Sequence, residues 1–434
     1  MAKEINKLNK SHSYIEWIVA VSVMFATTFT VAETFLDSFY PVLRIAAGIA
    51  RNFFLLLLFV YQIMHYGLKL KGKGMLFFTI YSIYVLLYIT IFPVYKLDDL
   101  VKAPTSIFNF FYRTGQVYLY LFCSKTILEH FNVTKFVLTS LFVAILPSIA
   151  VIQYIGPETL LMFGTDDDSE FSVLALGYCN GPLIVLSVLF CVRMFKAKYI
   201  SLLFSIAIAA SASYILLTGG ERGPIIWTIV NISACLMIKA KHLGRALAVL
   251  MIGIILFILN LGNIIDGLES ISPHAAEKME STFVEGDTNG RFDLDNSQGS
   301  TYIIGLRQFA SSPIYGSYFR LITNHPVFRG HYPHNLFVEI LITMGLFGFI
   351  PFIYLMIVAS KKMYVVLRRE HSDAEEACIA LFISTFLQLL TTATLVFNAA
   401  FWCFLYIVCN LNTSGHNKNR RLRVRKVLTN SSNG

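Results

Sequence analysis

The sequence has few charged residues for its length. Only 14% of its 434 residues are Asp, Glu, Lys or Arg, whereas 56% are hydrophobic, and the mean hydropathy is +0.63. Soluble globular domains have about a quarter charged residues, so this composition excludes that class. The chain has seven cysteines but no Cys-x-x-Cys pair, and all seven lie in or beside apolar segments. We therefore expect neither a disulfide framework nor a zinc site.

What the chain has instead is a series of apolar runs, each of about twenty residues and long enough to cross a bilayer as a helix. We predict an all-α polytopic membrane protein with about twelve transmembrane helices. The first run follows three lysines but lacks a small-residue cleavage site, so we expect an uncleaved helix. The predicted spans are 15–35, 41–66, 74–94, 107–127, 136–155, 173–193, 199–217, 223–239, 245–264, 335–359, 375–391 and 395–411.

The chain divides into four regions around one long polar connector. Residues 1–265 hold nine predicted helices, 266–333 form the connector, 334–411 hold three more helices, and 412–434 form a basic tail. The connector contains eight acidic and five basic residues. Loops of this length are usually functional, and the apolar residues in its second half predict helical pieces packed on the membrane domain.

The short connectors alternate in charge, which gives each helix a direction. By the positive-inside rule the basic connectors and both termini face the cytoplasm, and the long connector faces outward. The net charge of +9 therefore reports topology and contact with anionic lipid rather than binding of nucleic acid. The basic connectors contain Lys69/Lys71/Lys73, Lys125/Lys135, Arg193/Lys196/Lys198, Lys239/Lys241/Arg245 and Lys361/Lys362/Arg368/Arg369.

Several arginines break this bias, because the predicted topology puts them at the outer face or in the outer half of the bilayer. Ionisable groups at membrane depth are costly, so they usually mark a site. Guanidinium groups bind diphosphate oxygens in bidentate fashion, and we favour an anionic ligand. The alternative is that they pair with Glu33, Glu221, Glu339 or the run Asp166–Asp168, or reach outer headgroups. These arginines are Arg44, Arg51, Arg113, Arg222, Arg291, Arg307, Arg320 and Arg329.

A histidine lies where the long connector meets the tenth predicted helix. Pro333 ends the connector and His334 begins the helix, where the helix dipole favours a neutral imidazole. Such an imidazole can act as a general base on a sugar hydroxyl. The alternative is a histidine that only caps the helix. A metal site of His325, His331 and His334 is disfavoured, because no carboxylate or cysteine is obviously arrayed with them.

Four short motifs occur in order between residues 218 and 350. They are Thr218–Pro224 (TGGERGP), Asn289–Phe292 (NGRF), Ser312–Gly316 (SPIYG) and His334–Glu339 (HNLFVE) followed by Gly345 and Gly348. Together with the long connector they resemble the O-antigen ligase and polymerase family, whose members have a Thr-Gly-Ser-Arg-Gly turn and a Ser-Gly-Arg motif. Glu221 departs from that pattern, and so does the long spacing from Arg291 to Pro313. Arg307 is therefore an alternative to Arg291.

The resemblance implies metal-independent glycosyl transfer from an undecaprenyl-diphosphate-linked oligosaccharide at the periplasmic face of the bacterial inner membrane. It implies no cofactor, and its partners are the lipid-linked glycan, membrane lipid, a chain-length regulator and a flippase. The form of residues 332–339 favours an O-antigen or other surface-polysaccharide polymerase over a ligase that transfers glycan to lipid A core. From the topology and the resemblance together we expect catalytic roles for His334, Arg222 and Arg291, and substrate binding by Arg307, Arg44, Arg51, Arg113, Arg329, Tyr332, Asn335 and Glu339.

A flippase or transporter for the same lipid-linked sugars is the rival interpretation from another class. Transporters commonly have matched halves and broken helices at the midplane. Here the unusual cations gather toward the predicted outer face, and one large connector breaks any symmetry. A membrane sensor or scaffold without chemistry is the least favoured interpretation.

Overall fold

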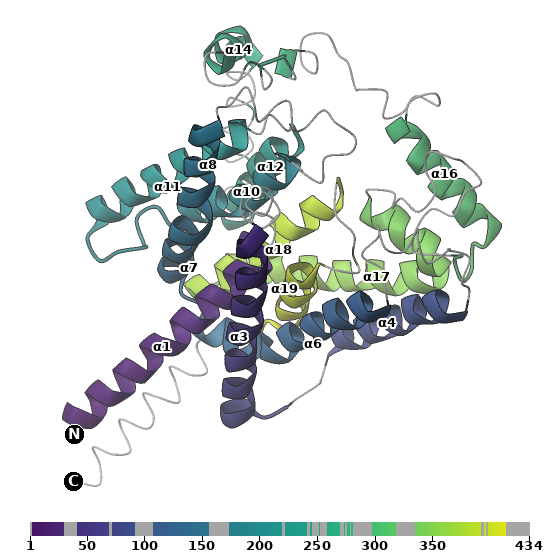
Figure 1. The fold of residues 1–434 in the computed structure, drawn as a ribbon, viewed down its shortest axis with the longest axis horizontal. Helices are drawn as coiled ribbons and strands as arrows, with labels where there is room; N and C mark the ends of the chain where they lie inside the picture. The colour runs from purple at the N-terminus through teal and green to yellow at the C-terminus, as the bar shows by residue number, and fades with distance from the viewer. Residues whose placement is uncertain are drawn as a thin grey trace.

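The computed structural model describes residues 2–29, 41–68, 72–91, 107–155, 173–218, 222–240, 258–269, 297–317, 335–391 and 398–413, with Leu395 and scattered residues between 244 and 280. Every element in this part of the chain is a helix, which confirms the all-α prediction there (Figure 1). The elements are α1 (Ala2–Ala26), α3 (Pro41–Tyr66), α4 (Lys73–Ile91), α6 (Ile107–His130), α7 (Val133–Ser140), the π-helical turn η1 (Leu141–Ile145), α8 (Leu146–Ile155), α10 (Val173–Leu189), α11 (Lys198–Thr218), α12 (Arg222–Lys239), α14 (Leu261–Glu269), α16 (Ser297–Ser311), α17 (Leu336–Arg368), α18 (Asp373–Leu389) and α19 (Ala399–Asn410).

Four helical stretches are long and apolar enough to cross a membrane. They are Ile45–Tyr66, Val133–Tyr154, Lys198–Leu217 and Leu336–Arg368. Other apolar helices are shorter, such as α18 with 17 residues and α19 with 12. The length and composition of the helices indicate a membrane protein. The count of twelve spans and the long outer connector stay predictions.

Most described helices lie close to the ranges expected from the apolar runs. α3 and α12 match theirs to within a residue, and Pro41 opens α3 at the first helical position, where a missing N–H costs nothing. α17 is longer than expected, because it continues past 359 through a polar stretch to Arg368. The predicted span 245–264 lies almost entirely outside the described residues, and α14 begins only at Leu261.

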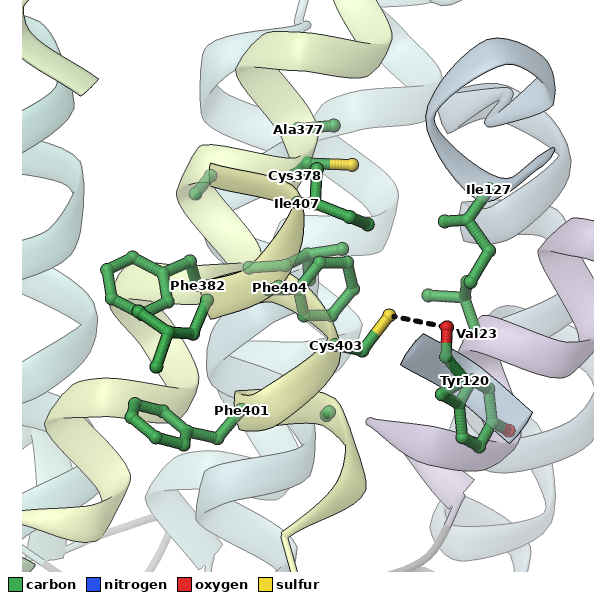
Figure 2. Packing of buried hydrophobic residues seen from close by; sticks show 14 of the residues in the cluster. Val23, Tyr120, Ile127, Ala377, Cys378, Phe382, Phe401, Cys403, Phe404 and Ile407 are labelled. Atoms are coloured by element: carbon green, nitrogen blue, oxygen red, sulfur yellow. Dashed lines mark hydrogen bonds between the residues drawn. The ribbon is translucent and has the colours of Figure 1, made fainter. Parts of the chain in front are cut away.

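The core is centred on α6, α18 and α19, with α1 against them. Figure 2 shows Phe382 of α18 and Phe401 and Phe404 of α19 packed in this region, all of them 2% exposed or less. The Cys403 thiol donates a weak hydrogen bond to the Tyr120 carbonyl oxygen at 3.8 Å, which holds α19 close to α6. In Figure 1, α4 runs beside α17, and α16 lies against α17.

Candidate functional site

The basic connectors expected on one side of the membrane meet at one end of the helix bundle. The Thr134 hydroxyl, beside Lys135, donates to the Met194 carbonyl at 2.6 Å, beside Arg193. Lys239 bonds to the first turn of α18, and Arg369 bonds to the carbonyl of Asn412. We call this the basic end. The contacts agree with the predicted grouping of these connectors, and the compartment that they face stays a prediction.

The opposite end, here the far end, is defined by the directions of three helices. α12 ends at the basic end, so its first residue, Arg222, lies about 26 Å away along the axis. Arg368, the last residue of α17, donates to the Ile238 carbonyl at 3.2 Å, and Glu339 in its first turn bonds to the Leu395 amide beyond the end of α18, so α17 begins at the far end. Thr391 follows α18 there. The starts of α12 and α17 therefore share one end of the bundle.

Thr391 connects the end of α18 to α12 and α10. The Trp227 indole N–H donates to the Thr391 hydroxyl at 3.0 Å, and the Tyr178 hydroxyl hydrogen-bonds to the same oxygen. Gly223 lies so close to Tyr178 that a Cβ there would stand 2.7 Å from its hydroxyl oxygen. The backbone at Arg222 is thus held against this group. The Arg222 side chain is outside the described atoms.

The first turn of α17 immediately follows the predicted base, His334. Asn335 caps the helix, because its side-chain oxygen accepts from the amides of Phe337 and Val338 at 3.0 and 3.2 Å. Glu339 is 1% exposed, and both of its carboxylate oxygens lie 3.1 Å from the Leu395 amide nitrogen. Both predicted substrate ligands therefore hold the fold together here, and their contact with substrate stays a prediction.

Two of the four sequence motifs meet at a kink in α17. Gly345 has φ +60° and ψ −155° inside the helix, a conformation that only glycine adopts readily. The segment Ser312–Ser317 packs on this kink. Leu346 and Phe347 donate their amides to the carbonyls of Pro313 and Ile314 at 2.8 and 2.9 Å, and Ser317 donates to Ile342 at 2.8 Å. The Tyr84 hydroxyl donates to the Tyr315 carbonyl and ties α4 to the same place.

Two of the predicted outer arginines lie together at the α3–α6 contact. Arg51 is buried, and its guanidinium donates to the Tyr112 hydroxyl at 3.5 Å, next to the half-buried Arg113. Asn52 donates to the same hydroxyl at 2.9 Å and accepts from Gln116 at 3.0 Å. Both helices end near the basic end, so this polar group lies toward the far end, and its location in the outer half of the bilayer stays a prediction.

The remaining predicted site residues are described only in part. Arg44 lies in α3, seven residues before Arg51 as expected, but its side chain is outside the described atoms. Arg307 is exposed on α16, near the end that leads to Ser312–Ser317. His334, Arg291, Arg329 and Tyr332 lie outside the described residues. Within the described ranges, no three His, Cys, Asp or Glu side chains are grouped as metal ligands would be.

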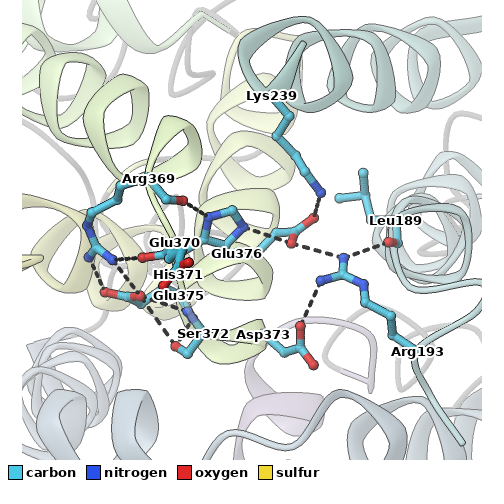
Figure 3. Close-up of polar contacts among 10 residues, drawn as sticks. All are labelled: Leu189, Arg193, Lys239, Arg369, Glu370, His371, Ser372, Asp373, Glu375 and Glu376. Atoms are coloured by element: carbon cyan, nitrogen blue, oxygen red, sulfur yellow. Dashed lines mark hydrogen bonds and ion pairs between the residues drawn. The ribbon is translucent and has the colours of Figure 1, made fainter. Parts of the chain in front are cut away.

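The sequence did not predict an ion cluster that lies at the basic end. Glu376 in α18 is fully buried and accepts hydrogen bonds from Lys239 at 2.6 Å, Arg193 at 3.0 Å and His371 at 3.1 Å (Figure 3). Arg193 also pairs with Asp373 at 2.8 Å. In the sequence, Arg193 and Lys239 were interpreted only as residues of basic connectors that indicate the topology. The acidic first turn of α18 was the one available hint that their partners lie there.

His371 has an acceptor at each ring nitrogen. Nε2 faces the Glu376 carboxylate, and Nδ1 faces the Arg369 carbonyl oxygen at 2.8 Å. Two acceptors require two N–H donors, so the site fits the protonated ring. The hydrogen bond to Glu376 accordingly raises the pKa of His371 above its ordinary value.

Comparison with known proteins adds no family to this geometry: no protein-family model matches the chain, and no curated protein matches it significantly.

Proposed function

We propose that the chain is a surface-polysaccharide polymerase of the O-antigen type. It transfers a glycan from undecaprenyl diphosphate onto a hydroxyl of another lipid-linked repeat unit. In this proposal the protein has twelve spans in the bacterial inner membrane, cytoplasmic termini and a site that faces the periplasm. A chain-length regulator and a flippase act with it.

The observation that carries the proposal is the common location of two helix starts. The first residue of α12 is Arg222, and the residue before the α17 cap is His334. Both helices run from the far end to the basic end, so both starts lie on the side opposite the basic connectors. A reaction at the periplasmic face needs the arginine and the base on that side. Arg51 and Arg113 lie toward the same end.

The chemistry follows from the charges that develop during transfer. The bond between the anomeric carbon and the diphosphate oxygen breaks, and the electron pair stays on the diphosphate. Arginines directed at that oxygen stabilise the growing negative charge, most strongly where water is excluded. The acceptor hydroxyl forms the new bond and gives its proton to His334. Arg222 and Arg291 are the proposed diphosphate ligands, with Arg307 able to share the second role.

Docking of Ser312–Ser317 on the kink at Gly345 supports the proposal from a second direction. These segments carry two of the four motifs on which the resemblance rests, and they contact one another through backbone hydrogen bonds. The contact joins α16, with Arg307, to the long helix that begins after His334. Motifs separated in sequence but packed together are expected of parts of one site.

A deletion strain complemented with single variants tests the proposed function. Arg222→Ala and His334→Ala are each expected to abolish chain extension while the protein stays inserted and abundant. Arg222→Lys should also abolish chain extension, because the lysine ammonium group cannot bind two diphosphate oxygens in the bidentate geometry of a guanidinium group. The matched control is Lys361→Ala, which removes an exposed cation at the basic end and should leave polymer length normal.

The readout is the lipopolysaccharide ladder together with the lipid-carrier pool. Loss of a polymerase leaves core capped with one repeat unit. Unsubstituted core would instead indicate a ligase, and repeat units trapped on the cytoplasmic leaflet would indicate a flippase. Normal polymer length in both alanine variants would remove Arg222 and His334 from the mechanism.

A further inference from the structure

Glu339 is an ionisable side chain buried in the first turn of the longest apolar helix. It is 1% exposed, and its two carboxylate oxygens share the amide of Leu395 at 3.1 Å each. The buried Tyr81 of α4 lies beside it. Carboxyl groups within membrane helices are costly and are usually retained for a function. Both of its oxygens lie within hydrogen-bond distance of the backbone of the α18–α19 connection.

Leu395 is held from its other side as well. Its carbonyl accepts from the Trp402 indole N–H at 2.8 Å, and Trp402 is 1% exposed in the core of α19. Leu395 therefore joins the first turn of α17 to α19 through both of its backbone groups. A buried amide left without its acceptor is destabilising, so the Leu395 amide depends on the Glu339 oxygens.

The same connection begins at Thr391, which is bound by Trp227 of α12 and by Tyr178 of α10. The α18–α19 connection therefore contacts α17 at one point and the first turns of α12 at another. Its described residues, Thr391 and Leu395, link the helix that follows His334 to the helix that starts at Arg222.

We propose that Glu339 is a positioning residue that fixes the start of α17, the helix that follows His334 in the sequence, relative to the start of α12 at Arg222. The inference rests on the proposed function and changes the role expected for Glu339 from substrate ligand to positioning. Glu339 acts through the Leu395 amide and not on the glycan. A catalytic base that moves by about 1 Å can cost about 100-fold in rate, so a side chain outside the reaction can control it.

The test compares Glu339→Gln with Glu339→Ala in membranes that contain the full chain and a lipid-linked repeat unit as donor and acceptor. Gln keeps a side-chain oxygen for Leu395 and should retain kcat within about threefold. Ala removes the acceptor and should lower kcat by about 10- to 100-fold with KM little changed. Thr343→Val is the control, because Thr343 lies one turn later, is equally buried, and its hydroxyl donates to the Glu339 carbonyl of its own helix.

A second measurement detects movement of the α18–α19 connection and does not depend on glycosyl transfer. A cysteine at Ala399, at the start of α19, should react faster with a soluble maleimide when Glu339→Ala frees the connection, and at the wild-type rate with Glu339→Gln. Unchanged labelling in Glu339→Ala, wild-type kcat in that variant, or a raised KM with normal kcat would each overturn the positioning role. If Glu339→Gln is abundant but inactive, the positioning role is also overturned, even if Glu339→Ala fails to accumulate. Normal polymer in His334→Ala and Arg222→Ala would instead overturn the proposed function itself.

Discussion

Glu376 is buried among three basic side chains, so replacing it should destabilise the folded protein. Removing one partner of a fully buried ion pair typically costs about 3–5 kcal/mol, and the loss here should be smaller because the side chains of Lys239 and Arg193 are 28% and 36% exposed. Glu376→Ala leaves Lys239, Arg193 and His371 facing one another. We expect a marked fall in the unfolding midpoint of the purified protein in detergent.

Asp373→Ala provides the control for that measurement. Asp373 also pairs with Arg193, but its side chain is 56% exposed, so the loss should be about 0–1 kcal/mol. Equal midpoints for Glu376→Ala and the wild type would show that the buried cluster does not stabilise the fold.

His371 should make the stability of the cluster depend on pH. Its pKa is raised in the folded protein above the ordinary value of about 6.5, chiefly by the hydrogen bond to Glu376. The stabilisation is therefore complete below the unfolded pKa and is lost as the pH rises through the folded pKa. The charged groups around the ring are Glu376, Lys239 and Arg193, and the effect of pH is measured between about pH 6 and 9.

The measurement is the difference in unfolding midpoint between the wild type and His371→Gln across that range. The difference should be largest near pH 6 and should shrink toward pH 9. A difference that is constant, or that grows with pH, would contradict a protonated ring at this position.

At the scale of single elements, the kink in α17 depends on Gly345. Its backbone conformation costs other residues about 1–3 kcal/mol. A Cβ would also stand 2.5 Å from the Ile314 carbonyl oxygen and 2.6 Å from the Gly316 nitrogen. Gly345→Ala should therefore destabilise the protein and release Ser312–Ser317, which proteolysis of the membrane preparation would detect.

Gly115→Ala is the matched control for the kink. Gly115 lies inside α6 with open space around it, so alanine should be neutral or slightly stabilising because of its higher helix propensity. If Gly345→Ala resisted unfolding and protease as well as Gly115→Ala did, the kink would not need glycine.

Helices α3 and α12 could be predicted from the sequence, because an apolar run and its end residues carry the signal locally. The contacts of Thr391 and Leu395 could not. Their partners are Trp227 and Glu339, which lie 164 and 56 residues away, and no periodic pattern encodes such a pairing. The role of Glu376 was hidden for the same reason, since its cations come from other helices. Gly345 was noted as part of a motif, but its kink requires the distant Ser312–Ser317.

At the scale of the whole molecule, the sequence predicted which connectors share a side, and the structure brings them to one end. Charge bias is a property of whole loops, so it survives errors in helix boundaries. The positions of Arg51 and Arg113 toward the far end agree with it. The site itself was only partly predictable, because several proposed ligands come from connectors whose packing the sequence does not determine.

The two ends of the bundle should face different compartments, and single cysteines can test this. Lys361 is exposed on α17 near the basic end, and Ala310 is exposed on α16, beside the segment that packs on the α17 kink. The two test variants are Lys361→Cys and Ala310→Cys. In intact spheroplasts a membrane-impermeant maleimide should label the residue 310 site and spare the residue 361 site, which should react only after permeabilisation. The unmodified chain, with its native cysteines, gives the background. Labelling of both sites from one side would remove the topological basis for placing Arg222 and the start of α17 at the periplasmic face.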